Sequence, residues 1–340
     1  MKKIIILKND AVGDLTHSLQ SINNIIKDNV NHNITIFLSD RSKNFSFLIK
    51  GNNIQFKVLN YDLTLFEKIK LFLRFFDKSI EKIYILTPKS FYYFLPLFFK
   101  KIKFYAICIN GYKNYKRPNE YLRKFLHKYV INNRGAIHKR DSTAKIQSEL
   151  TKISKIYELD HFNFKNKNLF LNDFFVKNYA YFHIKSQIIK KLGWSDVDLL
   201  KLFNTILRSY DNIYVTRDIE NSIIKKKYNF DYNLIDLKLK KLSVDNSKIY
   251  IFDNIEGLDL FNLINNSKKI IAFHGMMTNL AALNKKDVLD LFFCEIKDYN
   301  DYASYRNSFY EFKPQYKNYN FIIPSKNIDK TLKKMSFCLK

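Results

Sequence analysis

The chain has 340 residues, and its 58 Lys and Arg against 32 Asp and Glu give a formal net charge of +26 at pH 7. Hydrophobic residues make up 46% of the sequence, which supplies enough apolar surface for a packed core and excludes global disorder. The length predicts two domains, and the apolar runs are too short to span a bilayer. Only four apolar residues follow Met1-Lys2-Lys3, so we read no signal peptide and expect a cytoplasmic protein.

The strong positive charge favours an anionic partner: nucleic acid, a phospholipid leaflet, or a phosphorylated sugar or lipid. A coding sequence rich in A and T is the alternative explanation for part of this charge. Nucleic acid is the less favoured partner, because the sequence has no zinc-finger spacing, RNP-like segment or basic zipper. Cys108, Cys294 and Cys338 are too far apart to predict a disulfide framework or a metal site, and we expect buried or incidental thiols.

The first hundred residues alternate short apolar runs with longer amphipathic ones, which is the pattern of parallel strands joined by helices. We predict strands at residues 4–7, 34–38, 54–59, 83–86 and 104–109, and helices at residues 15–26 and 63–76. Residues 112–140 are dense in Lys and Arg. Such a segment is usually a solvated helix face, and the alternative is a site for an anionic acceptor.

Residues 160–173 are polar and predict the joint between two domains, residues 1–165 and 166–340. The alternation then resumes, with strands predicted at residues 179–184, 212–216, 249–252, 269–273 and 288–293, and helices at 197–208, 219–227, 258–265 and 277–283. A last helix, residues 328–337, is expected to pack on one domain or the other. Two such alternations predict an α/β fold made of two Rossmann-like, doubly wound domains.

The turn after the first strand is the first place to look for a site, because open parallel sheets bind ligands at the carboxyl ends of their strands. Gly13 permits a tight turn there, and Asp14 falls at the start of the following helix. Asp14 is either the helix N-cap or a carboxylate that faces a ligand. His17 lies one turn further on, and a histidine of the core is the alternative to a site residue there.

Residues 12–19, Val-Gly-Asp-Leu-Thr-His-Ser-Leu, resemble the opening motif of the bacterial heptosyltransferases of glycosyltransferase family 9. In that family the motif is a small residue, Gly-Asp, two residues, His, then Ser or Thr, Leu and Pro. The chain keeps the Gly-Asp, His, Ser and Leu. Val12 is a modest fit at the small position, and Gln20 stands in place of Pro.

A second segment, residues 260–283, resembles the nucleotide-sugar loop of the same family. The family has Asp-Thr-Gly, two residues, His, Leu and an Ala-rich helix start. Gly275 and Met277 align without a gap, whereas Phe273-His274 replace Asp-Thr and Thr278-Asn279 stand around the expected His. Gly275 would let the backbone approach a phosphate, and the following helix would offer free N–H groups to a diphosphate.

Two weaker correspondences lie between these segments. Residues 183–194 resemble a strand end followed by Lys and then Trp, where Lys190 is the implied phosphate-neutralising side chain and Lys191 its close competitor. The strand at 213–216 followed by Glu220 resembles the segment whose carboxylate contacts the nucleoside. A solvated surface is the alternative for each. The donor-site residues implied by the resemblance are Lys185, Ser186, Lys190, Lys191, Glu220, His274, Gly275, Met276, Met277, Thr278 and Asn279.

The resemblance implies the GT-B fold, with two Rossmann-like domains facing a cleft, the acceptor on the first and the nucleotide sugar on the second. It further implies an inverting, metal-independent glycosyltransferase that moves a heptose-like sugar to lipopolysaccharide or another cell-surface glycan. Asp14 would be the general base, and Lys190 would offset the charge of the leaving diphosphate. We expect no resident cofactor and no metal, since no Asp-x-Asp pair sits at a convincing loop. The family suggests an ADP-linked donor.

On the acceptor side, we expect contacts from Gly13, His17, Lys116, Arg117 and Lys124, with the basic segment held against the anionic inner leaflet. Two other interpretations stay open. The altered loop at residues 273–279 is compatible with a non-catalytic basic protein of the same fold that binds nucleic acid or an anionic membrane surface. Another GT-B enzyme, such as an epimerase, is the third interpretation. The oligomeric state is not predicted.

Overall fold

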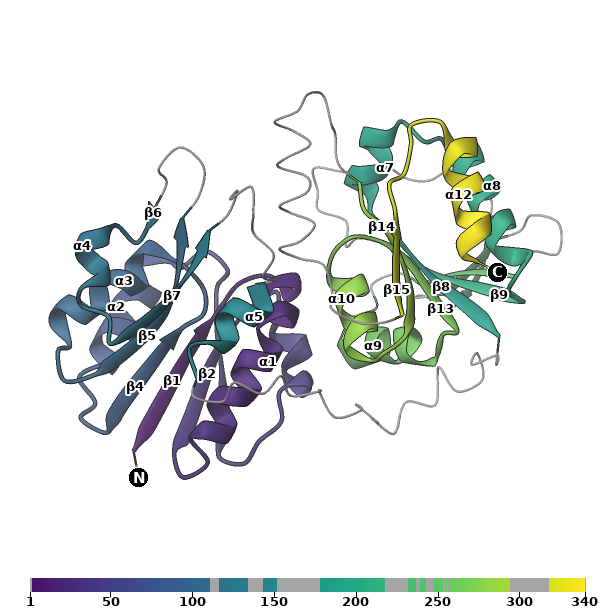
Figure 1. Cartoon of the computed structure of the whole chain (residues 1–340). Helices are drawn as coiled ribbons and strands as arrows, with labels where there is room; N and C mark the ends of the chain where they lie inside the picture. The colour runs from purple at the N-terminus through teal and green to yellow at the C-terminus, as the bar shows by residue number, and fades with distance from the viewer. Residues whose placement is uncertain are drawn as a thin grey trace. The chain divides into compact units, whose positions relative to one another are not determined.

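The computed structural model describes residues 2–110, 116–133, 143–151, 178–217, 232–236, 239–242, 248–252, 255, 257–293 and 318–339. The chain forms two compact units, the first containing the described residues up to 151 and the second those from 178 onward (Figure 1). The predicted domain joint at residues 160–173 and the predicted helix at 219–227 lie outside the described residues.

The first unit is built on a mainly parallel sheet. Its strands are β1 (Lys3–Lys8), β2 (Asn33–Ser39), β3 (Ile54–Leu59), β4 (Ile80–Ile85), β5 (Lys103–Asn110), the short β6 (Lys116–Arg117) and β7 (Lys128–Asn133). Parallel pairing gives the order β3-β2-β1-β4-β5-β7, and β6 pairs antiparallel with the end of β5. The order reverses between β1 and β4, so these two strands form the topological switch point of a doubly wound sheet. The five strands predicted for this unit are confirmed.

Helices cover both faces of this sheet (Figure 1). On one side lie α1 (Val12–Asp28) and, against it, α5 (Thr143–Ser148). On the other side lie α2 (Leu65–Arg74), α3 (Ser90–Phe98) and α4 (Glu120–Arg123), whose buried side chains share one core with β4 and β5. A 3₁₀ helix, η1 (Lys43–Leu48), follows β2. Leu15, Leu19, Ile22 and Ile26 recur at helical spacing and are buried, which explains why the sequence signal for α1 was clear.

The second unit repeats the architecture. Its parallel strands are β8 (Tyr179–Ile184), β9 (Asn212–Arg217), β12 (Ile249–Phe252), β13 (Lys269–Phe273), β14 (Asp287–Leu291) and β15 (Tyr319–Ile322), and β10 (Tyr232–Asp236) and β11 (Leu239–Leu242) add antiparallel strands at one edge. The parallel strands have the order β12-β9-β8-β13-β14-β15, which reverses between β8 and β13. Both units are therefore Rossmann-like, and the predicted fold class is confirmed.

The helices of the second unit are α7 (Ser186–Leu192), α8 (Asp196–Leu207), α9 (Gly257–Asn266), α10 (Met276–Leu283) and α12 (Ile328–Cys338). The sequence left open which domain α12 joins. Ile328 and Met335 of α12 share the core of the second unit with Trp194, and the Trp194 indole donates to the carbonyl of Ser325 at 2.9 Å. The last helix thus belongs to the second unit, beside α8 (Figure 1).

Of the helices that the structure describes, α3, α4, α5 and α7 were not predicted from the sequence. The α3 segment is almost wholly apolar and contains Pro96, so it lacks the two-faced pattern of a surface helix. In the described part of the chain, no helix combines the length and the apolar character needed to cross a membrane. Cys108 is buried, and burial raises the pKa of its thiol to about 12, which makes it inert.

Candidate active site

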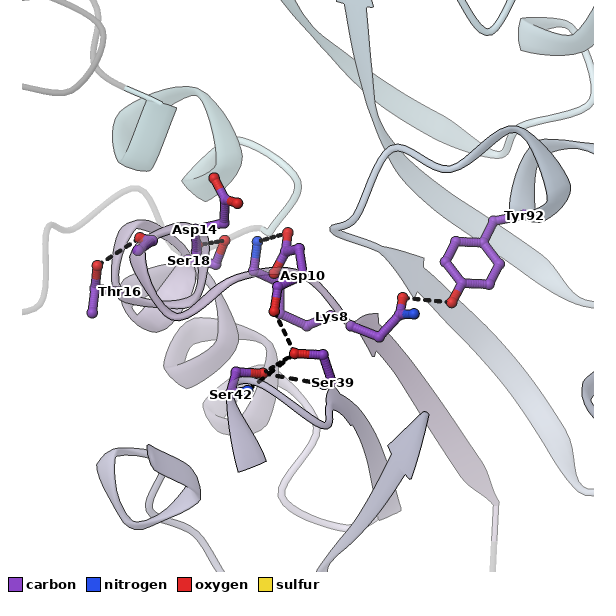
Figure 2. Close-up of polar contacts among 10 residues, drawn as sticks. Lys8, Asp10, Asp14, Thr16, Ser18, Ser39, Ser42 and Tyr92 are labelled. Carbon is purple, nitrogen blue, oxygen red and sulfur yellow. Dashed lines mark hydrogen bonds and ion pairs between the residues drawn. The ribbon is translucent and has the colours of Figure 1, made fainter. Parts of the chain in front are cut away.

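The turn after β1, at the first switch point, is fixed by hydrogen bonds to neighbouring elements. Asn9 is fully buried, accepts a hydrogen bond from the Tyr92 hydroxyl of α3 at 2.6 Å, and donates to the carbonyl of Asn60, after β3, at 3.1 Å. The Ser39 hydroxyl at the end of β2 donates to the carbonyl of Asp10. Figure 2 shows Tyr92 and Ser39 reaching the turn that leads into α1 from two sides. The start of α1 is therefore tied to the ends of β2 and β3 and to α3.

Lys8 and Asp10 form a buried ion pair within this turn (Figure 2). The Lys8 amine lies 2.7 Å from Oδ2 of Asp10, and the two residues are 1% and 8% exposed. Burial raises the pKa of the Asp10 carboxyl; Lys8 opposes this effect, and the nearby Asp14 charge adds to it. The other oxygen, Oδ1 of Asp10, is buried without a hydrogen-bond partner among the described residues. Neither residue was singled out from the sequence, although both directly follow the strand that the sequence predicts.

Asp14 lies in the first turn of α1 and is half-buried. The N-cap of α1 is Ala11, so the interpretation of Asp14 as the N-cap is wrong. Its carboxylate makes no hydrogen bond or ion pair with the described residues, and in Figure 2 no contact reaches it. The N-terminal end of a helix favours a negative charge at this position. Asp14 is thus an ionisable group at the carboxyl edge of the sheet that none of the described side chains engages.

The neighbours of Asp14 in the predicted motif are placed as follows. Gly13 lies inside the first turn of α1, so the prediction that it forms the tight turn before the helix is wrong; the turn is made by the residues ahead of Val12. His17 is half-buried and lies three residues after Asp14, on the same side of α1.

Two cations flank an aromatic ring beside this edge. The Arg41 guanidinium carbon lies 4.1 Å, and the Lys89 amine 4.9 Å, from the centre of the Tyr61 ring. The Lys89 amine is buried without a hydrogen-bond partner among the described residues, and burial lowers its pKa. The three residues come from the loops after β2, β3 and β4, and the charges of Asp62, Asp10 and Asp40 act on the Lys89 amine at the same edge of the sheet.

Most of the described basic residues in the segment predicted to bind the acceptor make contacts within the first unit. Lys116 pairs with Glu120, and Arg117 donates to the carbonyl of Pro88 at 3.2 Å. Arg123 is buried and donates to the Asn110 side chain at 2.6 Å. Lys124 is exposed. Residues 111–115 and 134–142 lie outside the described part of the chain.

At the second switch point, between β8 and β13, the loop after β13 leads directly into α10. Gly275 has φ +154°, a conformation that favours glycine. The Lys185 amine donates to the carbonyl of His274 at 3.1 Å and lies 3.5 Å from the place that a Cβ on Gly275 would occupy. The Thr278 hydroxyl accepts from the Gly275 N–H at 3.2 Å and donates to its carbonyl at 2.8 Å. Lys185, His274 and Gly275 thus lie together at this switch point.

A buried carboxylate fixes the His274 ring. His274 Nδ1 lies 2.5 Å from Oδ2 of Asp290, a fully buried residue of β14, and the Tyr319 hydroxyl donates to the same oxygen. The ring packs against Phe292, with 4.5 Å between centroids. Asp290 and Tyr319 were not predicted from the sequence as site residues. A carboxylate in the middle of an otherwise apolar predicted strand was the available signal for Asp290.

The other predicted donor residues divide into three groups. Met277, Thr278 and Asn279 are buried, and Met277 accepts a hydrogen bond from the buried Tyr181 at 3.4 Å, so their side chains support the loop. Ser186 and Met276 are half-buried at the starts of α7 and α10, whereas Lys190 and Lys191 are exposed in the last turn of α7. Glu220 lies outside the described residues. Among the side chains that the structure describes, no group of three or more His, Cys, Asp or Glu could hold a metal ion.

No protein-family model and no curated protein matches the sequence. Solved structures do match. E. coli ADP-heptose LPS heptosyltransferase II is 12% identical, with a TM-score of 0.62 over 100% of this chain and 98% of that chain. A glycosyl transferase family 9 protein from Veillonella parvula is 11% identical, with a TM-score of 0.65 over 98% and 89%. A putative UDP-N-acetylglucosamine 2-epimerase from Listeria monocytogenes is 10% identical, with a TM-score of 0.56 over 100% and 88%.

These similarities define the class of protein: a GT-B-type chain of two Rossmann-like domains. The resemblance to the heptosyltransferases of glycosyltransferase family 9, expected from two short motifs, is confirmed at the level of the fold. The epimerase shares that fold, so the reaction has to be argued from the site. The alternative of a non-catalytic, nucleic-acid-binding protein gains no support from the comparisons.

Proposed function

We propose that this protein is an inverting, metal-independent glycosyltransferase. It moves a heptose-like sugar from a nucleoside diphosphate donor to lipopolysaccharide or another cell-surface glycan, on the cytoplasmic side of the membrane. The observation that carries the proposal is the half-buried Asp14 carboxylate, which the described residues leave unengaged at the first switch point of a heptosyltransferase-like fold. The name of the E. coli relative contains ADP-heptose, which supports an ADP-linked donor here.

Asp14 is the general base of the proposed reaction. Its carboxylate accepts the proton of the acceptor hydroxyl as the oxygen attacks the anomeric carbon of the donor sugar, a contribution of roughly 10²- to 10⁴-fold in rate. The exposed Arg41 at the same edge of the sheet and the exposed Lys124 offer positive charge to an acidic acceptor.

The second unit binds the donor. When the bond between the sugar and the diphosphate breaks, the electron pair leaves with the diphosphate, and the negative charge there increases. We expect Lys185, the first N–H groups of α10 and the His274 ring held by Asp290 to oppose that charge; the contacts of Lys185 and Asp290 with His274 support this role. Lys190 and Lys191 lie in the last turn of α7, and their long side chains have to extend from there to contact the diphosphate. The reaction needs no resident cofactor, because the nucleotide sugar is a substrate.

Calorimetry and thermal unfolding with ADP, UDP and GDP, and with sugars linked to each, test the proposal. At about 100 times its dissociation constant, the correct nucleotide should stabilise the protein by about 2.7 kcal/mol. Asp14→Asn should retain this binding and lose turnover by at least about a hundredfold. Asp28→Asn, at the opposite end of the same helix, is the matched control and should keep both.

Three outcomes contradict the proposal in different ways. Absence of binding to every nucleotide supports the non-catalytic interpretation. Epimerisation of a UDP-sugar without transfer assigns the chain to the reaction named for the Listeria relative. Full turnover by Asp14→Asn removes Asp14 as the base and leaves donor binding in place.

A further inference from the structure

The outward face of α2 is apolar. Leu65, Phe66, Ile69, Leu73 and the following Phe76 are 73%, 73%, 51%, 62% and 63% exposed. Leu65, Ile69 and Leu73 are four residues apart and form one stripe along the helix. Of the ten residues of α2, Leu71 alone is buried. A surface helix normally turns its apolar side to the core, so α2 has a second apolar side that the fold does not bury.

The exposed apolar surface continues onto α3. The ring of Phe72 lies between the two helices, 5.6 Å from the Phe76 ring and 5.4 Å from the Phe98 ring of α3. Phe98 is 65% and Phe94 49% exposed. We call the set Leu65, Phe66, Ile69, Leu73, Phe76, Phe94 and Phe98 the α2–α3 apolar face. Soluble monomers rarely expose a contiguous apolar patch of many large side chains unless it meets a partner.

Positive charge surrounds this face. Lys70 on α2, Lys78 after it, and Lys100 and Lys101 after α3 are exposed. The pKa of Lys57 on β3 is lowered by burial and then by the charges of Arg74 and Lys70. Of the nearby acids, Glu67 accepts from the N–H groups of Asn60 and Thr64, and Asp77 pairs with Lys3. Exposed Lys side chains therefore flank the face, and the exposed Asp62 in the loop before α2 is the acidic residue among them.

We propose that the α2–α3 apolar face docks on an anionic phospholipid bilayer. Phe and Leu side chains enter the headgroup and acyl boundary, and the surrounding Lys side chains contact lipid phosphates, which is the recognition chemistry of an interfacial amphipathic helix. The net charge of +26 complements an anionic leaflet and disfavours a second copy of this chain. This surface differs from the basic segment that the sequence analysis assigned to the membrane.

Docking on this face brings the candidate acceptor edge close to the lipid. Helix α2 follows β3, so its first residues, Leu65 and Phe66, lie at the same carboxyl edge of the parallel sheet as the turn with Asp10. The hydrogen bond from Asn9 to Asn60 joins that turn to the loop that leads into α2. The benefit of bringing the acceptor edge to the lipid rests on the proposed transfer to a membrane-borne glycan. The docking itself does not depend on that function.

Flotation of the full chain with vesicles tests the proposal without any donor or acceptor. Phosphatidylcholine vesicles containing phosphatidylglycerol should bind the wild type, and pure phosphatidylcholine vesicles should bind it much more weakly. Phe66→Gln with Ile69→Gln and Leu73→Gln should weaken partitioning by at least about tenfold. Lys70→Gln with Lys100→Gln and Lys101→Gln should also weaken it, and added salt should lower the binding of the wild type.

The matched control is Val197→Gln with Phe337→Gln, which removes two exposed apolar side chains of the second unit, 61% and 73% exposed, and should leave partitioning unchanged. Equal binding by the Phe66/Ile69/Leu73 variant and the wild type overturns the proposal, as does absence of binding to anionic vesicles. A wild-type dimer in light scattering that this variant loses assigns the face to self-association instead. Donor binding measured in vesicle-free buffer reports on the proposed function separately.

Discussion

At the residue scale, the stability of the first unit should depend on the ion pair between Lys8 and Asp10 at the first switch point. Both are buried, and each is the charged partner of the other. Asp10→Ala should therefore lower the free energy of unfolding by about 3–5 kcal/mol, because it leaves the Lys8 ammonium buried and unpaired. Urea unfolding measures the loss. The double variant Lys8→Met with Asp10→Leu should recover much of it, since no uncompensated charge remains; a double variant as unstable as Asp10→Ala would contradict this explanation.

Asp290 acts on the donor site through His274, not by direct contact. Asp290→Asn replaces the acceptor of the His274 Nδ1 hydrogen bond with a group that also donates, so the ring loses its fixed orientation. We expect nucleoside diphosphate binding to weaken by about tenfold or more in calorimetry, the scale of a charge-assisted hydrogen bond. Tyr319→Phe keeps the His274 contact and should cost less affinity. Equal losses in both variants, in step with lost stability, would indicate a purely structural role.

At the scale of elements, Asp77 fastens the segment before β4 to β1. Its carboxylate accepts from the Lys3 amine at 2.7 Å and from the N–H and hydroxyl of Ser79 at 2.9 and 2.6 Å. These contacts hold the pKa of Asp77 below its usual value of 3.8. A lowered pKa in the folded state contributes stability that is present above pH 3.8 and is lost as the pH falls below it.

Asp77→Asn should therefore be less stable than the wild type at neutral pH, and the difference should shrink in acid. Urea unfolding at a series of pH values between neutral and acid checks this prediction. Asp62→Asn, an exposed carboxylate of the loop before α2, serves as the control and should leave the acid limb of the stability curve unchanged. A difference that stays constant with pH would show that only the hydrogen bonds of Asp77, and not its charge, matter.

Most of the described strands were predictable because each is a local run of apolar residues, whereas β6, β7, β10, β11 and β15 were not predicted. Ile54–Leu59, Tyr179–Ile184, Ile249–Phe252 and Lys269–Phe273 are found at the predicted residues. Helix α7 was not predictable in the same way. Its seven residues include only Ile189 and Leu192 as buried positions, too few to show a periodicity, and its end is set by Gly193 with φ +71°.

At the scale of the whole molecule, the two units have separate switch points, and the proposed donor belongs to the second. Hydrogen exchange with and without the bound nucleoside diphosphate should show added protection at the loop before α10 and the start of α7. Without vesicles present, nucleoside diphosphate binding should leave the hydrogen-exchange rates of the α2–α3 apolar face unchanged. Protection confined to the first unit would contradict the assignment of the donor to the second.

The sequence by itself determined the α/β class, the two strand-helix alternations and the Gly-Asp motif, because these depend on residues close together in the chain. Only the tertiary structure decided which distant residues meet: Asn9 with Tyr92, and His274 with Asp290 and Tyr319. It also decided the orientation of α2. The periodicity of α2 shows that the helix has an apolar side, but not that Leu71 packs toward the sheet while Leu65, Ile69 and Leu73 face solvent. Burial is a property of the packed chain, and local sequence spacing does not contain it.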